Sequence, residues 1–111
     1  MCKRLIDLGF LLDGSDISGL SNFRKILNFV KNLLDYFMIS ADKTRFSVIS
    51  YASSPTLKIR FSETFATKQD RDSAIDAISY PGGGTNTGGA LDLAYNSMFR
   101  TSNGARSTSG I

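Results

Sequence analysis

The first strong feature of the chain is a nearly continuous apolar run over residues 5–12, interrupted by Asp7. Runs of this length without alternation are typical of a strand covered on both faces, as in a parallel sheet. A polar turn begins at Asp13 and ends the strand. The run is too short and too interrupted for a membrane span, and no clear cleavage site follows it, so we expect neither a span nor a signal peptide.

A helix is predicted over residues 20–38, because its apolar positions recur at spacings of three and four. These positions are Phe23, Ile26, Leu27, Val30, Leu33, Leu34 and Phe37. Polar and charged residues occupy the other face, and Ser21 or Asn22 is placed to cap the start. The helix therefore buries one face against the predicted sheet.

Two further strands are predicted over residues 45–51 and 56–61, joined by a turn that contains Pro55. The second alternates strictly, with Lys58 and Arg60 on its polar side, as an edge strand does. Because the link between the two strands is short, we expect an antiparallel hairpin.

The second half of the sequence predicts two helices and a polar tail. Thr67 is placed to cap the first helix, over residues 68–79, and a glycine-rich break follows at residues 81–84. The second helix follows that break, and we expect six of its residues to be buried. These are Ala90, Leu91, Ala94, Tyr95, Met98 and Phe99. Residues 100–111 offer little to bury and are predicted to form a surface loop.

The order of the elements predicts one α/β domain over residues 1–111, with helices on the faces of a small sheet. The first strand is apolar on both faces, so we expect it to be central. The predicted elements give it only one neighbour, which suggests that further sequence belongs beside it.

Composition excludes several classes of site. The 13 basic and 10 acidic residues are scattered, so a nucleic-acid surface has little support. The chain has no histidine, which excludes a Ser-His-Asp triad, a Cys-His pair and an HExxH zinc site within it. Cys2 is the one cysteine, so neither a cysteine cluster nor an internal disulfide is available.

Candidate chemistry lies in two loops that precede helices. The first, residues 13–19, contains Asp13 and Ser15 directly after the first strand, where ligands bind in open α/β sheets. The second, residues 82–89, is rich in glycine and contains Thr85 and Thr87. Carboxylate and hydroxyl oxygens are hard donors that suit Mg²⁺ or Mn²⁺.

Simpler and competing interpretations exist for both loops. The first could be a plain turn into a helix, and the threonines of the second could cap the helix that follows. Neither phosphate-binding pattern fits, since no Gly-Lys-Ser/Thr occurs and Thr87 stands where G-x-G-x-x-G needs its last glycine. An aspartyl-phosphate enzyme that uses Asp13 usually needs a second aspartate at position 15, which is a serine. We therefore expect a binding module and not an enzyme.

Together the two loops, in this order around a helix and a hairpin, resemble the von Willebrand factor type A domain over residues 5–99. Asp13-Gly14-Ser15 and the segment Gly83-Gly84-Thr85-Asn86-Thr87-Gly88 carry the resemblance. It implies a truncated Rossmann-like fold, with central parallel strands and an antiparallel edge hairpin.

The resemblance also implies a metal-ion-dependent adhesion site with Asp13, Ser15 and Thr85 as ligands. A carboxylate from an extracellular matrix or cell-surface protein completes the coordination in such domains. An extracellular location is implied as well, with a partner for Cys2 in further sequence.

Two departures from the family pattern affect the predicted site. Ile17 stands where the family has a second serine, and Ser18 follows it. Ser18 is a tentative ligand if the loop shifts by one residue, and Asp16 is a weaker substitute. The family's last aspartate lies in a later strand, beyond Ile111. A metal-independent interaction module with the same fold is therefore the alternative interpretation.

Overall fold

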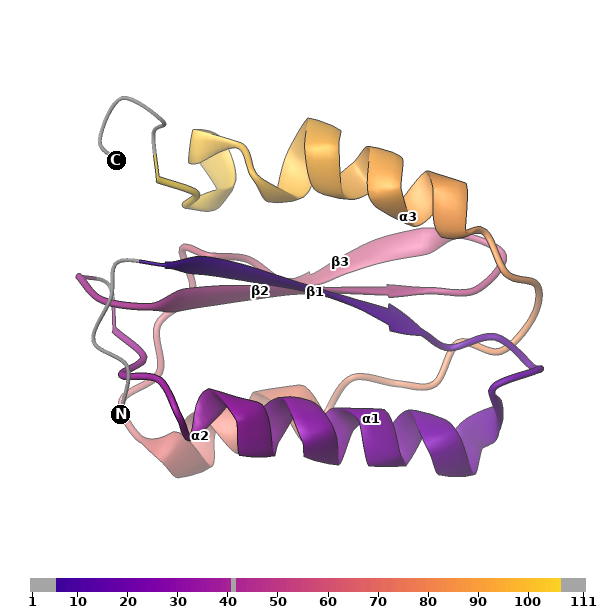
Figure 1. The fold of residues 1–111 in the computed structure, drawn as a ribbon, viewed down its shortest axis with the longest axis horizontal. Helices are drawn as coiled ribbons and strands as arrows, with labels where there is room; N and C mark the ends of the chain where they lie inside the picture. Colours follow the sequence, from indigo (N-terminus) through magenta and orange to yellow (C-terminus); the bar gives the residue numbers. More distant parts are fainter. Residues whose placement is uncertain (1–5, 41, 107–111) are drawn as a thin grey trace.

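The computed structural model describes residues 6–40 and 42–106 of the chain. Three strands form one sheet in the order β1-β2-β3. Figure 1 shows the sheet between two helical layers, with α1 and α2 on one face and α3 on the other. The α/β architecture with an antiparallel edge hairpin is therefore as predicted.

Strand β1 (Asp7–Asp13) pairs in parallel with β2 (Arg45–Tyr51), whose predicted bounds are confirmed. The register aligns Asp7 with Arg45 and Asp13 with Tyr51. The predicted elements give β1 one neighbour, and in the sheet formed by residues 6–40 and 42–106 that neighbour is β2. In that sheet β2 is central and fully covered, whereas most apolar side chains of β1 are only half-buried. Strand β1 therefore lies at an edge of the sheet that the described residues form.

Strand β3 (Pro55–Ile59) is antiparallel to β2, with a register shift between Val48 and Ile49. It ends earlier than predicted because the chain turns at Arg60, where the Arg60 amide donates to the Glu63 carboxylate at 3.2 Å. Phe61 is nevertheless buried, as its alternation predicted.

The layer of α1 (Gly19–Leu34) and α2 (Lys68–Asp76) covers one face of the sheet. Helix α1 starts at Gly19, so the predicted capping by Ser21 or Asn22 is wrong. The predicted cap of α2 is confirmed, because the Thr67 hydroxyl accepts from the Asp70 amide at 3.1 Å. The core of this layer contains Leu12, Phe23, Leu27, Val30, Leu34, Phe46, Val48, Ile59, Ile75 and Ile78.

The opposite face is covered by α3 (Thr87–Leu93), the π-helical turn η1 (Ala94–Met98) and the 3₁₀ turn η2 (Thr101–Asn103). The predicted burial is correct for Ala90, Ala94 and Met98, which face the sheet. It is wrong for Leu91, Tyr95 and Phe99, which are largely exposed. Leu93 packs against the same core and is partly buried.

The prediction of a surface loop after residue 100 needs a partial correction. Ala105 is buried, and the Asn103 side chain donates to the carbonyl of Ser97 at 2.8 Å. The Asn103 carbonyl accepts from the Ser62 amide at 3.1 Å. Small residues and backbone hydrogen bonds, not apolar bulk, pack this segment onto the sheet. Residues 107–111 and Cys2 lie outside the described residues.

No helix among the described residues is long and apolar enough to cross a membrane.

Candidate functional site

The two predicted loops lie together at the carboxyl end of β1. The Gly14 amide donates to the Tyr51 carbonyl at 2.7 Å, which extends the β1–β2 pairing into the first loop. The Gly82 amide donates to the Gly14 carbonyl at 2.9 Å, and the Asp16 amide donates to the Gly83 carbonyl at 2.9 Å. Backbone hydrogen bonds in both directions therefore hold the second loop against the first.

Three glycines make this close approach possible. A Cβ added at Gly14 would lie 2.5 Å from two ring carbons of Pro81, so only glycine fits between the loops. Gly82 and Gly83 have φ values of 66° and 105°, a region that side chains strongly disfavour. The glycine run, which the sequence predicted to be a loop, therefore has a specific backbone conformation and faces the first loop.

Asp13 and Ser15 form a compact group at the start of the first loop. The Ser15 amide donates to the Asp13 carboxylate at 2.9 Å. This hydrogen bond is the main cause of a lowered pKa at Asp13, and the nearby hydroxyls of Ser15 and Ser18 lower it further. Asp13 is therefore ionised at neutral pH and available as an oxygen ligand.

The Ser15 side chain has an unusual environment. Ser15 is 1% exposed, and its hydroxyl oxygen makes no hydrogen bond of normal geometry within the described part of the chain. A buried polar group without a partner costs about 1–3 kcal/mol, so such a group is often part of a functional site. The hydroxyl lies beside the Asp13 carboxylate, which is the arrangement that a shared cation would need.

Tyr80 supports the first loop and was not predicted from the sequence. Its hydroxyl donates to the Ser15 carbonyl at 3.0 Å, and its ring lies 5.7 Å from that of Phe23. Burial, followed by the Asp16 carboxylate, raises the pKa of Tyr80, so the phenol stays protonated as a donor. The only sequence signal was an aromatic residue directly before the Pro-Gly break.

Ile17 and Ser18, where the sequence departs from the family pattern, differ in their surroundings. Ile17 is 92% exposed and points into solvent. Ser18 is half-buried at the start of α1, does not cap that helix, and its hydroxyl contributes to the lowered pKa of Asp13. Of the two residues, Ser18 is the one whose hydroxyl acts on Asp13.

Thr85 is exposed on the second loop, next to the glycines that contact the first loop. The predicted alternative, in which Thr85 or Thr87 caps the next helix, is wrong because Asn86 supplies the cap by accepting from the Gly89 amide at 2.9 Å. The Thr85 hydroxyl is therefore not used as a helix cap.

Ser53, in the turn between β2 and β3, is a second residue that the sequence did not reveal. Its hydroxyl accepts from the Gly84 amide at 2.8 Å, and the neighbouring Ala52 carbonyl accepts from the Asn86 amide at 2.7 Å. The hairpin turn thus fixes the backbone on both sides of Thr85. A serine in a polar turn has no sequence feature that indicates this contact.

The donor set fits a hard divalent cation. The described residues contain no cluster of three His, Cys, Asp or Glu side chains that could hold a metal. The candidate donors are instead one carboxylate and several hydroxyls, all oxygen, with one hydroxyl buried and unpartnered. A site with so few protein charges suits an ion that retains water and accepts a ligand from outside.

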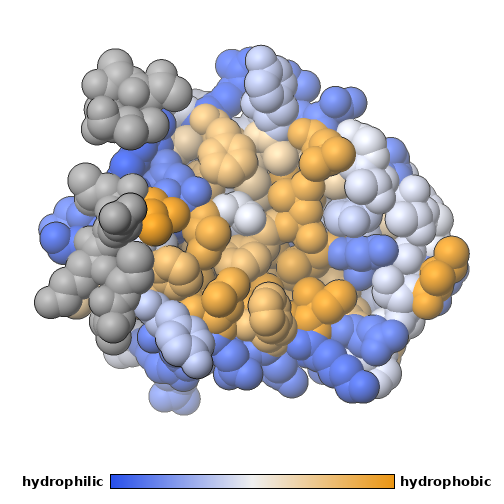
Figure 2. Space-filling model, viewed as in Figure 1, coloured by the Kyte–Doolittle hydropathy of each residue, from blue (hydrophilic) through white to orange (hydrophobic). Residues whose placement is uncertain are grey.

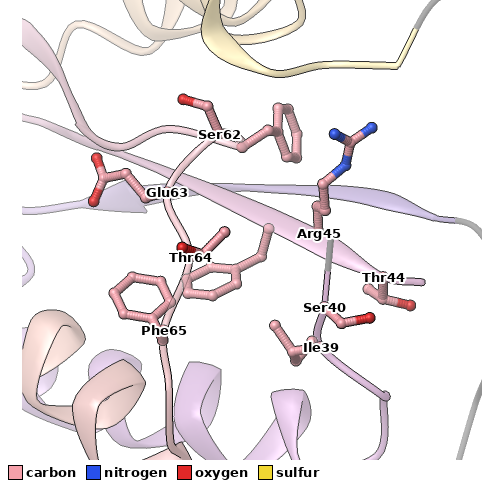
Figure 3. Close-up of a pocket in the computed structure, with 10 residues that line it drawn as sticks. Ile39, Ser40, Thr44, Arg45, Ser62, Glu63, Thr64 and Phe65 are labelled. Carbon is pink, nitrogen blue, oxygen red and sulfur yellow. The ribbon is translucent and has the colours of Figure 1, made fainter. Parts of the chain in front are cut away.

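A separate hollow of about 240 Å³ lies at the other end of the sheet, at the amino end of β2. Figure 3 shows Phe65 and Ile39 beside it, while the guanidinium of Arg45 points away from Ile39. The Arg45 Nε lies 3.4 Å from the Asp7 carboxylate, so this cation is already paired. Its lining also includes the Glu63 carboxylate and the hydroxyl side chains of Ser40, Thr44, Ser62 and Thr64.

Comparisons with known proteins agree with the fold and the loops. Vitrin from Bos taurus is 41% identical over 101 residues, which cover 91% of this chain and 15% of vitrin. The human collagen alpha-5(VI) chain is 39% identical over 100 residues, which cover 90% of this chain and 4% of the collagen chain. The chain thus spans a small part of these relatives.

A solved structure of proximal thread matrix protein 1 from the mussel byssus, with a zinc-occupied MIDAS motif, superposes with a TM-score of 0.79. It is 27% identical, and the match covers 88% of this chain and 26% of the byssus protein's chain. The family profile of the von Willebrand factor type A domain matches residues 7–111. The chain therefore belongs to the von Willebrand factor type A domain family.

Proposed function

We propose that the chain is a protein-binding module that uses a divalent cation held by Asp13, Ser15 and Thr85, with Ser18 as a further hydroxyl. The observation that carries this proposal is the buried Ser15 hydroxyl, which lies beside the Asp13 carboxylate, helps to keep it ionised and makes no hydrogen bond of normal geometry within the described residues. The hydrogen bonds between the two loops bring the Thr85 segment to the same end of the sheet.

The chemistry of the donors suggests Mg²⁺ or Mn²⁺ as the ion. These ions prefer oxygen ligands, and Mg²⁺ usually retains several waters. A cation with one protein carboxylate keeps positive charge, so it attracts a carboxylate from a partner. The zinc-occupied motif of the byssus protein supports divalent-metal binding in the family.

The partner that fits is an extracellular matrix or cell-surface protein with an exposed acidic side chain. Relatives that include a collagen chain and a thread matrix protein support this class and an extracellular location. Binding of this kind forms a shared coordination bond and needs no catalytic group in the chain.

A titration with Mg²⁺ or Mn²⁺ tests the metal. We expect saturable binding to the intact chain and loss of binding in Asp13→Ala. Asp92→Ala is the matched control, because Asp92 is an exposed aspartate on α3, outside the two loops. Identical titrations of the intact chain and Asp13→Ala would overturn the metal site.

The alternative is partner binding without metal, and the exposed Ile17 at the site favours it because its side chain supplies no oxygen ligand. Binding to a collagen-coated surface, measured with Mg²⁺ and with EDTA, separates the two. The metal-dependent proposal expects binding to disappear in EDTA and in Thr85→Ala. Binding that survives both changes selects the metal-independent module.

A further inference from the structure

The broad apolar area across the middle of Figure 2 lies where Figure 1 places β1. Further sequence of the domain is expected beside that strand, so we assign the area to the domain's own interior. The segment after η1 offers a different feature, which rests only on contacts that the described residues make. This feature is the dipeptide Asn103-Gly104 at the end of η2.

Asn103 is the one asparagine of the sequence that a glycine follows. Asparagine deamidates when the backbone nitrogen of the next residue attacks its side-chain carbonyl carbon, and a side chain on that next residue hinders the attack. Glycine has no Cβ, so Asn103 is the asparagine whose sequence favours this reaction most. The other asparagines precede Phe23, Phe29, Leu33, Thr87 and Ser97.

The fold needs both residues of this dipeptide. Gly104 has a φ of 92°, and a Cβ added there would overlap the Ser62 backbone, so only glycine fits. The Asn103 side chain donates to the Ser97 carbonyl at 2.8 Å and accepts from the Arg60 Nε at 3.0 Å. An aspartate cannot do both, because an ionised carboxylate only accepts hydrogen bonds. The packing of this segment therefore requires a chemically labile pair.

The same contacts hold Asn103 in a conformation that opposes the reaction. The attacking nitrogen is that of Gly104, which donates its hydrogen to the Thr101 carbonyl at 3.0 Å. The Asn103 amide nitrogen has a second acceptor in the Ser97 hydroxyl at 3.2 Å. The side chain has to leave Ser97 and Arg60 before it can turn to the Gly104 nitrogen. Deamidation then requires local opening of the segment, and its rate follows the fraction of open molecules.

We propose that Asn103 is a site of spontaneous covalent modification, which the folded chain suppresses and local opening permits. In this reaction the Gly104 nitrogen forms a bond to Cγ of Asn103, and the bond from Cγ to Nδ2 breaks. The proton of the Gly104 amide leaves with the side-chain nitrogen as ammonia, and a succinimide ring remains. Water then opens the ring at either carbonyl and gives aspartate or isoaspartate. The only co-reactant is water.

Both products weaken the attachment of η2 to the segment that follows β3. An aspartate at position 103 places a carboxylate beside the Ser97 carbonyl, so two acceptors face each other and the donor is lost. An isoaspartate inserts the side-chain Cβ into the main chain, where the Asn103 carbonyl accepts from the Ser62 amide at 3.1 Å. Neither product reverts to asparagine, so the change is irreversible.

Peptide mass spectrometry of the full chain, incubated at mildly alkaline pH with and without guanidinium chloride, tests the site. Trypsin cuts after Arg100 and Arg106, so the peptide 101–106 contains Asn103 and no other asparagine. We expect Asn103 to deamidate first in the unfolded chain, and at least about tenfold more slowly in the folded chain. Asn96 is the internal reference, because a small serine follows it. Equal rates at the two asparagines in denaturant, or equal rates at Asn103 in both conditions, would overturn the proposal.

Arg60→Ala tests whether the side-chain contacts suppress the reaction in the folded chain. It removes the donor to Asn103, and Lys58→Ala is the matched control because Lys58 is an exposed cation two residues earlier. We expect Arg60→Ala to deamidate at Asn103 at least about threefold faster than wild type, and Lys58→Ala to keep the wild-type rate. Circular dichroism checks that both variants fold. The same rate in both variants would contradict suppression by this contact.

Asn103→Asp reproduces one product and tests its effect on the fold. Asn96→Asp is the control, since it adds the same charge at an exposed position of η1. We expect the urea midpoint of Asn103→Asp to lie at least about 0.3 M below that of Asn96→Asp, because the donor to Ser97 is lost. Equal midpoints would contradict the weakened attachment of η2.

Discussion

Gly14→Ala should separate the two loops of the site, and its cost follows from one contact. The added Cβ would lie 2.5 Å from both Cγ and Cδ of Pro81 and 3.4 Å from the Phe23 ring. The proline ring cannot rotate away, so the backbone of one loop must move. That movement breaks the 2.9 Å hydrogen bond from the Gly82 amide to the Gly14 carbonyl.

The expected loss of stability has two parts. Overpacking in a tight site costs about 1–3 kcal/mol. Loss of one backbone hydrogen bond costs about 1 kcal/mol. The free energy of unfolding should therefore fall by about 2–4 kcal/mol. With a urea m value of about 1–3 kcal/mol/M, the unfolding midpoint should fall by roughly 0.7–4 M.

Urea unfolding followed by circular dichroism measures this difference, and Gly88→Ala is the matched control. A Cβ at Gly88 would meet nothing within 4 Å, and Gly88 lies in α3. Its replacement should leave stability unchanged or raise it by up to about 1 kcal/mol, because alanine favours helix. If Gly14→Ala and Gly88→Ala had the same midpoint, the close packing of the two loops would be refuted.

Three further changes probe the fold around the site. Asn86→Ala removes the cap of α3 and should cost about 1 kcal/mol in urea unfolding; a neutral result would mean that the cap is not formed. Asp35→Asn should destabilise the chain at neutral pH, because the hydrogen bond from Arg71 lowers the pKa of Asp35. A lowered folded pKa gives stability that is present above the unfolded pKa and lost as pH falls through the folded pKa, so the difference from wild type should vanish in acid; a difference independent of pH would contradict this origin. Gly104→Ala should destabilise by more than about 1 kcal/mol, since φ is 92° and the new Cβ would overlap the Ser62 backbone; thermal melts that match wild type would contradict the packing of this segment.

Periodicity was sufficient to predict much of the fold. The range of β2 and the cap at Thr67 were correct because both depend on local patterns. Strand β1 lies at an edge of the described sheet, as its single predicted neighbour implied, although its apolar run is typical of a strand covered on both faces. The predicted burial of Leu91 and Tyr95 was wrong. Helical spacing indicates which side of a helix is apolar, but not how much of that side the sheet covers.

The position of the two candidate loops was predictable from the sequence, whereas the residues that support them were not. Asp13 and Ser15 were identifiable from their place after a buried strand, and the structure places the second loop against them. Tyr80 and Ser53 hold the loops through contacts between residues far apart in sequence. Such contacts leave no local pattern, so only the three-dimensional structure reveals them.

Calorimetric titration of Mn²⁺ into wild type, Ser15→Ala and Ser21→Ala tests the metal site most directly. The buried Ser15 hydroxyl lies beside Asp13 and makes no hydrogen bond of normal geometry within the described residues, whereas Ser21 is exposed on α1. Loss of one ligand should weaken binding by at least about tenfold, or about 1.4 kcal/mol. The proposed site predicts this loss in Ser15→Ala and none in Ser21→Ala. Equal affinities in all three proteins, or no binding to wild type, would contradict it.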